Sequence, residues 1–389
     1  MENNLPLSSV LDQLLKKNIA FACWFNPMEN CLGFVAGNAS DVKLFDRFDQ
    51  LNGEAGFVFA PYRITEKCPV ILLKPFIYLE DFKSSDQLDF SKILPFGAIE
   101  KADDHCDGCT KEEYIRTIEE TVAAIRESDL SKVIISRKIP VKRPAGSPGS
   151  IFFQLHDQTP NAFTYLVNLP AAGIWMGATP EVLLKSEGQF FETVSLAGTQ
   201  VRKYDSDDYY WNTKDIEEQA FVSRYMLELF YCFDIHKYRT TGPETLESGK
   251  VAHLKTSFFF PAEKIEKCLG NFVAELHPTP AVCGLPKNLA DEFIRKKEKH
   301  DRKYYTGYLG PWKLNQQVDL FVNLRCMEIT DDEFILYAGG GITSKSIPER
   351  EWEETNQKAN TLLSVIQNER PLPPDTFLSG QAVPPRGKA

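Results

Sequence analysis

The chain has 389 residues, of which 43% are hydrophobic and 25% charged, as in a globular protein of one large domain or two medium ones. Its formal net charge of −10 argues against a general binder of nucleic acid. No apolar run reaches the ~20 residues that cross a bilayer, and the first residues lack the pattern of a signal peptide. We therefore expect a cytoplasmic protein with no membrane partner.

The nine cysteines are an odd number spread along the chain, which argues against a disulfide scaffold and predicts reduced thiols. Cys23, Cys232 and Cys326 lie in apolar runs and are expected to fill the core. Cys106 and Cys109 form one C-x-x-C motif beside His105. Because no second pair follows, we favour a solvated loop over a zinc or redox site there.

Short apolar runs separated by turn residues predict strands in the first 105 residues. These runs are 19–25, 31–36, 56–62 and 70–79.

A helix is predicted after Thr110, because Thr110 and Glu113 form a capping box ahead of an apolar stripe. We expect this helix to end near Ser128. A strand dense in β-branched residues follows at 132–139, and 140–150 is predicted to be a loop.

The rest of the chain is predicted to contain several strands and two long helices. The strands are 163–169, 174–178, 182–186, 190–196, 318–329 and 333–339, and the helices are 214–233 and 348–368. Regular alternation of strand and helix is absent, which disfavours a parallel sheet. We predict an α+β fold with large antiparallel sheets and helices on the outside.

The segment from Tyr337 to Ile342 contains three consecutive glycines, which let a ligand approach the backbone closely. Their spacing does not fit a dinucleotide-binding motif. Pro348 then opens a helix in which Glu351, Glu354 and Lys358 share one face, because they are spaced i, i+3 and i+7. Two carboxylates and one ammonium can hold a divalent cation and an anion together. This pattern predicts a metal-assisted site for an acidic small molecule.

A second carboxylate pair, Asp215 and Glu218, lies near the start of the 214–233 helix. Acidic helix faces are usually only solvated, but two such pairs favour a site with oxygen ligands. Hard cations such as Mg²⁺ prefer carboxylates, and no histidine and cysteine cluster indicates zinc. Mg²⁺ is therefore the predicted cofactor.

Three further residues have the chemistry of a catalytic site. Lys132 alternates with Ile134 on one strand face, so it is either solvated or, if that face is interior, a base whose pKa desolvation lowers. Glu181 follows Pro180 at a bend, where it is either an exposed turn residue or a positioned general acid. Arg325 lies in an apolar run, which we interpret as a strand, and a buried guanidinium needs a carboxylate partner that a ligand could supply.

Several short motifs complete the pattern. They are Leu196-Ala197-Gly198-Thr199, Val251-Ala252-His253-Leu254, the run LHPTPAVCG at 276–284, Tyr304-Tyr305-Thr306-Gly307 and Asn323-Leu324-Arg325-Cys326. In this order, together with the residues above, they resemble the chorismate-utilising enzymes from about residue 110 to 368. The first hundred residues match only loosely.

The resemblance implies two large antiparallel sheets forming a two-layer core with outer helices. It implies one domain over 1–389, with a variable N-terminal part at 1–105, a catalytic core at 106–370 and a loose tail at 371–389. It also implies that Glu218 and Glu354 bind Mg²⁺ with support from Asp215 and Glu351. Chorismate would contact Ile134, Gly198, Thr199, His253, Ala281, Tyr305, Arg325, Gly339, Gly341 and Lys358.

Within the family, Lys132 resembles the lysine of the branches that use water, because amine-using relatives lack it. Ala197 stands where one type of amine-using relative has a nucleophilic lysine, and Ala281 where pyruvate-eliminating relatives often have threonine. The resemblance thus implies isochorismate formation, for menaquinone or siderophore biosynthesis, in which Lys132 activates water and Glu181 protonates the leaving hydroxyl. Salicylate synthase and an amine-using subunit are the alternatives. We expect a monomer without a glutaminase subunit.

Overall fold

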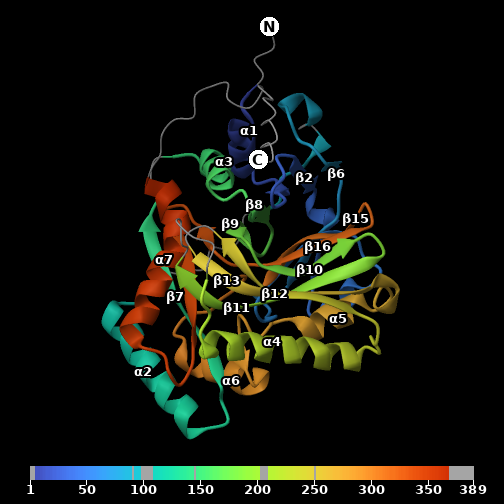
Figure 1. The fold of residues 1–389 in the computed structure, drawn as a ribbon. Helices are drawn as coiled ribbons and strands as arrows, with labels where there is room; N and C mark the ends of the chain where they lie inside the picture. The colour runs from blue at the N-terminus through green and yellow to red at the C-terminus, as the bar shows by residue number, and fades with distance from the viewer. Residues whose placement is uncertain are drawn as a thin grey trace, which may run out of the picture.

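Two nine-stranded antiparallel sheets form the centre of the molecule (Figure 1). The computed structural model describes residues 5–89, 92–97, 108–143, 146–201, 209–248 and 251–367. In spatial order, the first sheet contains β14 (Gly284–Leu285), β7 (Lys132–Lys142), β18 (Glu333–Ile342), β17 (Cys326–Ile329), β9 (Gly173–Thr179), β8 (Phe163–Leu169), β1 (Ala20–Phe25), β2 (Leu32–Gly37) and β6 (Ile77–Leu79). The second contains β12 (Arg239–Ser248), β13 (Val251–Pro261), β11 (Phe190–Val201), β10 (Val182–Glu187), β16 (Gln317–Val322), β15 (Tyr308–Leu314), β4 (Gly56–Ala60), β5 (Val70–Leu73) and β3 (Val42–Phe45).

The two sheets pack face to face through large side chains. Because successive strand residues point to opposite faces, Trp24 of β1 faces the second sheet while its neighbours Cys23 and Phe25 face the helices. Across the interface, the Trp24 ring lies 5.1 Å from Phe57. The rings of Phe163 and Phe321 stack at 4.2 Å. This interface is one continuous apolar core.

Helices cover the outer faces of both sheets (Figure 1). They are α1 (Leu7–Lys16), α2 (Lys111–Glu127), α3 (Pro148–Gln158), α4 (Thr213–Cys232), α5 (Leu269–Leu276), α6 (Lys287–Lys297) and α7 (Pro348–Gln367). The first sheet packs on α1, α3 and α7, and the second on α4 and α5. The predicted α+β fold is confirmed. None of the described helices combines the length and apolar character needed to cross a bilayer.

The capping box predicted for α2 is present, because the Thr110 hydroxyl accepts from the Glu113 amide while the Glu113 carboxylate accepts from the Thr110 amide. The helix ends at Glu127 with Ser128 as its C-cap. Both long helices, α4 and α7, lie within one residue of their predicted bounds.

Three predicted elements were wrong. The run 70–79 is two strands, β5 and β6, which belong to different sheets. The run 318–329 is also two strands, β16 and β17, separated by a break that contains Arg325. The predicted loop at 140–150 contains the end of β7 and the start of α3. Pro140 is tolerated in β7 because β14 pairs only with Lys132 and Val133, which leaves the rest of that edge of β7 without a partner among the described strands.

The eight cysteines in the described ranges are free, as predicted. Cys23 and Cys326 are buried, but Cys232 is exposed at the end of α4, so its predicted core position was wrong. His105 and Cys106 of the C-x-x-C segment, and the predicted tail at 371–389, lie outside the described residues. The division of the chain into three parts stays a prediction.

Candidate active site

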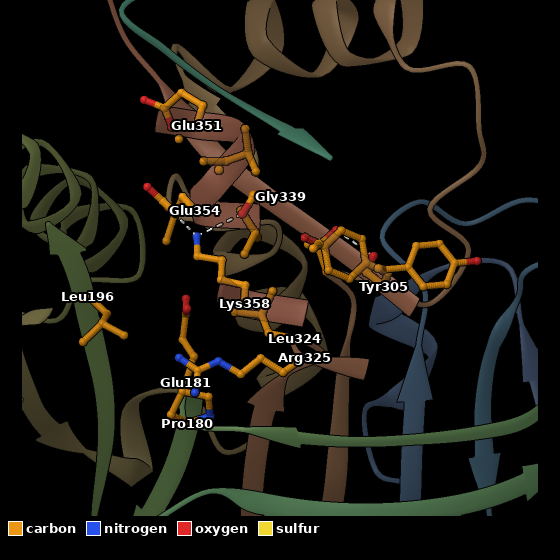
Figure 2. A pocket seen from close by; sticks show the side chains of 18 of the residues that line it. Pro180, Glu181, Leu196, Tyr305, Leu324, Arg325, Gly339, Glu351, Glu354 and Lys358 are labelled. Atoms are coloured by element: carbon orange, nitrogen blue, oxygen red, sulfur yellow. Dashed lines mark hydrogen bonds and ion pairs between the residues drawn. The ribbon is translucent and has the colours of Figure 1, made fainter. Parts of the chain in front are cut away.

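A cavity of about 170 Å³, partly open to solvent, lies where the start of β7 and the glycine run of β18 meet α4 and α7 (Figure 2). The predicted site residues whose side chains are described all line it, together with the predicted glycines. They are Lys132, Ile134, Glu181, Gly198, Asp215, Ala281, Tyr305, Arg325, Gly339, Gly341, Glu351, Glu354 and Lys358. The side chains of Thr199, Glu218 and His253 lie outside the described part of the structure.

Gly340 of the predicted glycine run also lines the cavity. The cavity further contains residues to which the sequence analysis gave no role of their own. They are Pro180, Leu196, Val282, Thr306, Leu324, Tyr337 and Ala338. Each lies within two residues of a predicted site residue, so this closeness in the sequence was the available signal.

Glu181 lies in the bend between β9 and β10, which is fixed to β16. The Val322 amide donates to the Glu181 carbonyl at 2.9 Å, and the Thr179 hydroxyl donates to the Val322 carbonyl at 2.6 Å. The residue is 8% exposed, so it is not the exposed turn residue of the simpler interpretation. Burial raises the pKa of Glu181 to about 7, against the opposing effects of Lys132, Lys358 and Arg325. A carboxyl group with this pKa can hold and release a proton near neutral pH.

Lys132 begins β7 and is 6% exposed, so the strand face that it shares with Ile134 is interior. Gly341 leaves room for its side chain, because a Cβ atom there would lie 2.9 Å from Lys132 Cε. The positive charge of Lys132 acts on Glu181 more strongly than that of any other group. The absence of a side chain at Gly341 therefore makes room for the Lys132 side chain as well as for a ligand.

Arg325 lies in the break between β16 and β17 and has a φ of 47°, a left-handed conformation that is uncommon outside glycine. The break is held by Asn323, whose side chain donates to the Tyr304 carbonyl at 2.8 Å and accepts from the Tyr165 hydroxyl at 2.5 Å. Burial lowers the pKa of Arg325 to about 10, while the Glu181 carboxylate raises it. The Arg325 guanidinium lies beside Glu181, with Lys358 on the other side of that carboxylate (Figure 2).

Tyr305 forms an aromatic wall of the cavity. Its ring stacks on Tyr337 at 5.3 Å, and Tyr337 stacks in turn on Trp175 at 5.4 Å. A Cβ atom at Gly339 would lie 3.0 Å from the Tyr305 hydroxyl. The phenol and the glycine backbone therefore meet at the same wall.

The helix face predicted from the sequence points into the cavity. Lys358 Nζ lies 2.7 Å from Glu354 Oε1 and donates to the Gly339 carbonyl at 2.9 Å (Figure 2). Glu351 is 7% exposed, and a Cβ atom at Gly340 would lie 3.2 Å from its Oε2 atom. The missing side chain at Gly340 lets both carboxylates of α7 approach the sheet.

Asp215 approaches the cavity from α4. It is 7% exposed and takes part in a capping box with Asn212, whose side chain accepts from the Asp215 amide at 3.0 Å. Gly198 lies beneath it, since a Cβ atom there would be 3.2 Å from the Asp215 Cβ. Asp215 thus starts the helix and presents a carboxylate to the same cavity as Glu354.

Arg302, which the sequence analysis missed, holds two walls of the cavity from behind. Its guanidinium donates to the carbonyls of Ile134 at 2.8 Å and Val282 at 2.9 Å. It pairs with Glu298 at 2.6 Å, and both side chains are almost fully buried. It also lies over the Tyr62 ring at 4.6 Å. Apart from Glu298, four residues away, these partners come from distant segments, so the sequence did not indicate that it holds the cavity.

The charges of the cavity favour a cation as well as an anion. The described side chains contribute three basic groups, Lys132, Arg325 and Lys358, and four carboxyl groups, Glu181, Asp215, Glu351 and Glu354. Within the described part of the chain, no three histidine, cysteine, aspartate or glutamate side chains form a metal site by themselves. The oxygen donors from α4 and α7 nevertheless suit a hard divalent cation that also takes ligands from water or substrate.

Comparison with known proteins agrees with this chemistry. The family model "Chorismate binding enzyme" matches residues 85–367. The vibriobactin-specific isochorismate synthase of Vibrio cholerae is 30% identical over 262 residues, which are 65% of this chain and 66% of that protein. The isochorismate synthase EntC of Escherichia coli K12 is 30% identical over 245 residues, which are 61% and 62% of the two chains. The chain thus aligns with slightly less than two thirds of the length of these relatives.

A solved structure shows the same fold. The protein DhbC of Bacillus anthracis superposes with a TM-score of 0.75 at 24% identity, covering 92% of this chain and 99% of that one. The two-sheet architecture is therefore shared over nearly the whole length of both chains.

Proposed function

Because the chain belongs to the chorismate-binding enzyme family, we propose that it is an isochorismate synthase. The reaction is the reversible conversion of chorismate to isochorismate, with water added at ring carbon 2 and the 4-hydroxyl lost. The relatives named above carry this activity in their names. The observation that carries the proposal is the buried pair of Lys132 and Glu181 in one cavity.

Lys132 is the proposed base. Its amine takes a proton from a water molecule as the water oxygen bonds to ring carbon 2. Glu181, protonated, gives its proton to the 4-hydroxyl, which leaves as water while both ring double bonds shift. The pKa of about 7 suits Glu181 to this task, because it holds a proton near neutral pH and can give it up. One carbon–oxygen bond forms at ring carbon 2 and one breaks at ring carbon 4. One water molecule is taken up and one is released, so no further reactant is consumed.

The substrate carries two carboxylates, and we propose a separate group of residues for each. Arg325 and Tyr305 bind the enolpyruvyl carboxylate, because a guanidinium can form a bidentate, charge-assisted contact with a carboxylate. Lys358 and the backbone at Gly339 and Gly341 contact the carboxylates as well. Ile134, Gly198, Thr199, His253 and Ala281 surround the ring.

Mg²⁺ is the proposed cofactor, held by Glu218 and Glu354 with Asp215 and Glu351 beside them. When bound, Mg²⁺ would hold the ring carboxylate and offset the surplus of carboxylates in the cavity. The oxygen-only donor set supports this assignment. With the substrate held in this way, the attacking water and the leaving hydroxyl are aligned with Lys132 and Glu181.

Salicylate formation is the neighbouring alternative, since it passes through the same product before pyruvate is lost. Ala281 disfavours salicylate formation, because pyruvate-eliminating relatives often have threonine there. Ala197 disfavours a covalent route, because it leaves no nucleophilic lysine at position 197. The amine-using alternative is disfavoured by Lys132. Whether the product serves menaquinone or siderophore biosynthesis stays open, and the monomeric state, the cytoplasmic location and the lack of a glutaminase subunit remain predictions.

The test is to incubate the purified protein with chorismate and Mg²⁺, without an amine donor, and to separate the products by chromatography. We expect isochorismate and little salicylate, and the same mixture when the reaction starts from isochorismate. Salicylate and pyruvate as main products would assign a salicylate synthase. Anthranilate formed on addition of ammonia would overturn the role given to Lys132.

A further inference from the structure

Arg137 lies on the same strand as Lys132, on the opposite face, and contacts α7. It is 5% exposed. Its Nε donates to the Thr355 hydroxyl at 2.9 Å, and its Nη2 donates to the Asn356 side-chain oxygen at 2.5 Å. The guanidinium lies over the Trp352 ring, with Cζ 3.8 Å from the ring centroid. One side chain of β7 thus contacts α7 at three points.

These three points lie on the turn of α7 that carries the cavity residues. Trp352 follows Glu351, and Thr355 and Asn356 lie between Glu354 and Lys358 in the sequence. Residues three or four apart share a helix face, so the contacts of Arg137 fix a face adjacent to the one that points into the cavity. A rotation of this turn would move the carboxylates and the ammonium together.

A second support holds Trp352 from α2. The Tyr114 ring lies 5.8 Å from Trp352, and its hydroxyl donates to the Ile135 carbonyl on β7 at 3.2 Å. Trp352 therefore lies between Arg137 and Tyr114, both of which are anchored to β7.

The distance between α7 and β18 is narrowly defined. In the pairing of β7 with β18, Arg137 is opposite Ala338 and Ile135 is opposite Gly340. At Gly340 the missing Cβ would lie 3.2 Å from Glu351 Oε2, and Lys358 reaches the Gly339 carbonyl at 2.9 Å. A shift of α7 would change the Lys358 hydrogen bond and the close approach of Glu351 to the backbone of Gly340.

We propose that Arg137 is a positioning residue that sets the rotation and depth of α7, so that Glu351, Glu354 and Lys358 face Lys132 across the cavity. It contacts neither substrate nor cation. This proposal rests on the proposed function as far as the reaction is concerned. The effect on the cation-binding carboxylates of α7 can be tested without it.

Arg137→Lys is the main test, because lysine keeps the charge and loses the guanidinium over the Trp352 ring and the two directed hydrogen bonds. Arg143→Lys is the matched control, since Arg143 follows the same strand, donates to the Thr330 carbonyl at 3.1 Å and lies 6.0 Å from the Phe334 ring. Asn356→Ala removes one of the hydrogen bonds with a smaller change. For each variant, Mg²⁺ affinity is measured by titration calorimetry. The kcat and KM are measured with chorismate as substrate, and the midpoint of thermal unfolding is recorded as well.

We expect Arg137→Lys to weaken Mg²⁺ binding about tenfold and to lower kcat/KM by about ten- to a hundredfold, the size expected for lost hydrogen bonds to a charged group. Asn356→Ala should change both in the same direction by less, and Arg143→Lys should change neither.

Unchanged Mg²⁺ affinity and kcat/KM in Arg137→Lys would overturn the inference. So would equal losses in Arg143→Lys, or losses that only follow the fraction of folded protein, because Arg137 would then be merely structural. If the wild-type protein left chorismate unchanged, the proposed function would fail, and the calorimetry would still decide the role of Arg137.

Discussion

Lys358 and Glu354 form an ion pair of 2.7 Å between successive turns of α7, inside the cavity. The two side chains are 28% and 30% exposed, so the pair contributes little to stability, on the order of 0–1 kcal/mol. Glu354 is also a proposed Mg²⁺ ligand. A divalent cation can therefore take over this carboxylate at low cost and leave the ammonium to an anionic ligand.

Glu354→Gln should abolish Mg²⁺ binding and reduce turnover to near background, because an amide oxygen is a poor substitute for a charged ligand. Excess chelator should have the same effect on the wild-type protein, and added Mg²⁺ should restore activity. Glu353→Gln is the control, since Glu353 is exposed on the same helix and does not line the cavity. Full activity in excess chelator would contradict the metal assignment.

Lys132→Ala should lower kcat by about two to four orders of magnitude, the usual contribution of a positioned proton-transfer group. The KM for chorismate should change much less, because other residues hold the carboxylates. Lys142→Ala, at the exposed far end of β7, should behave as the wild type. A variant with normal kcat and a raised KM would make Lys132 a binding residue instead of a base.

Glu181→Gln should lower kcat by a similar factor of about two to four orders of magnitude, since the amide keeps size and polarity but has no acidic proton. The double variant with Lys132→Ala should lose less than the product of the two single losses, because both groups act in one displacement. Full multiplication of the two losses would indicate that the residues act in separate steps.

The sequence predicted most of the cavity because motifs with chemical character lie at the ends of regular elements. The spacing of Glu351, Glu354 and Lys358 is a helical period, and the structure places all three on the cavity face of α7. Lys132 and Ile134 alternate along a strand, and both line the cavity. Local periodicity was sufficient in these cases.

Periodicity could not find the features that depend on distant partners. Arg325 was expected within a strand, but the strand is interrupted just before it, where Asn323 donates to the Tyr304 carbonyl and accepts from the Tyr165 hydroxyl. The contacts by which Arg302 and Arg137 hold the cavity and α7 join segments that are far apart in the sequence, so local spacing did not indicate them. The split of 70–79 between two sheets follows from the packing of those sheets and not from the apolar character of the run.

Activity should depend on pH through Glu181, whose pKa burial raises to about 7. The general acid is protonated below this value, so the contribution of Glu181 to kcat should fall as the pH rises above it. Lys132 acts as a base only when neutral, so its contribution should rise with pH and oppose this fall in the wild type. The measurement is therefore the residual kcat of Lys132→Ala against pH, at saturating chorismate and Mg²⁺, which should fall at alkaline pH. A residual kcat that does not fall at alkaline pH would contradict the role of Glu181 as acid in the rate-limiting step.

The same shift of pKa predicts how stability depends on pH. Between pH of about 4.5 and 7 the folded protein retains a proton on Glu181 that the unfolded chain releases, so stability falls as the pH rises through this window. Above pH 7 the buried carboxylate is ionised at a cost of up to about 3 kcal/mol, from roughly 1.4 kcal/mol per unit of pKa. Glu181→Gln has no such proton, so it should unfold at a higher denaturant concentration than the wild type at pH 8 and at about the same one at pH 4. Denaturant unfolding at both pH values measures this difference. Equal stability of Glu181→Gln and the wild type at pH 8 would mean that Lys132, Lys358 and Arg325 fully offset the cost of burying the carboxylate. Glu181 would then hold no proton near neutral pH, and another group would have to be the acid.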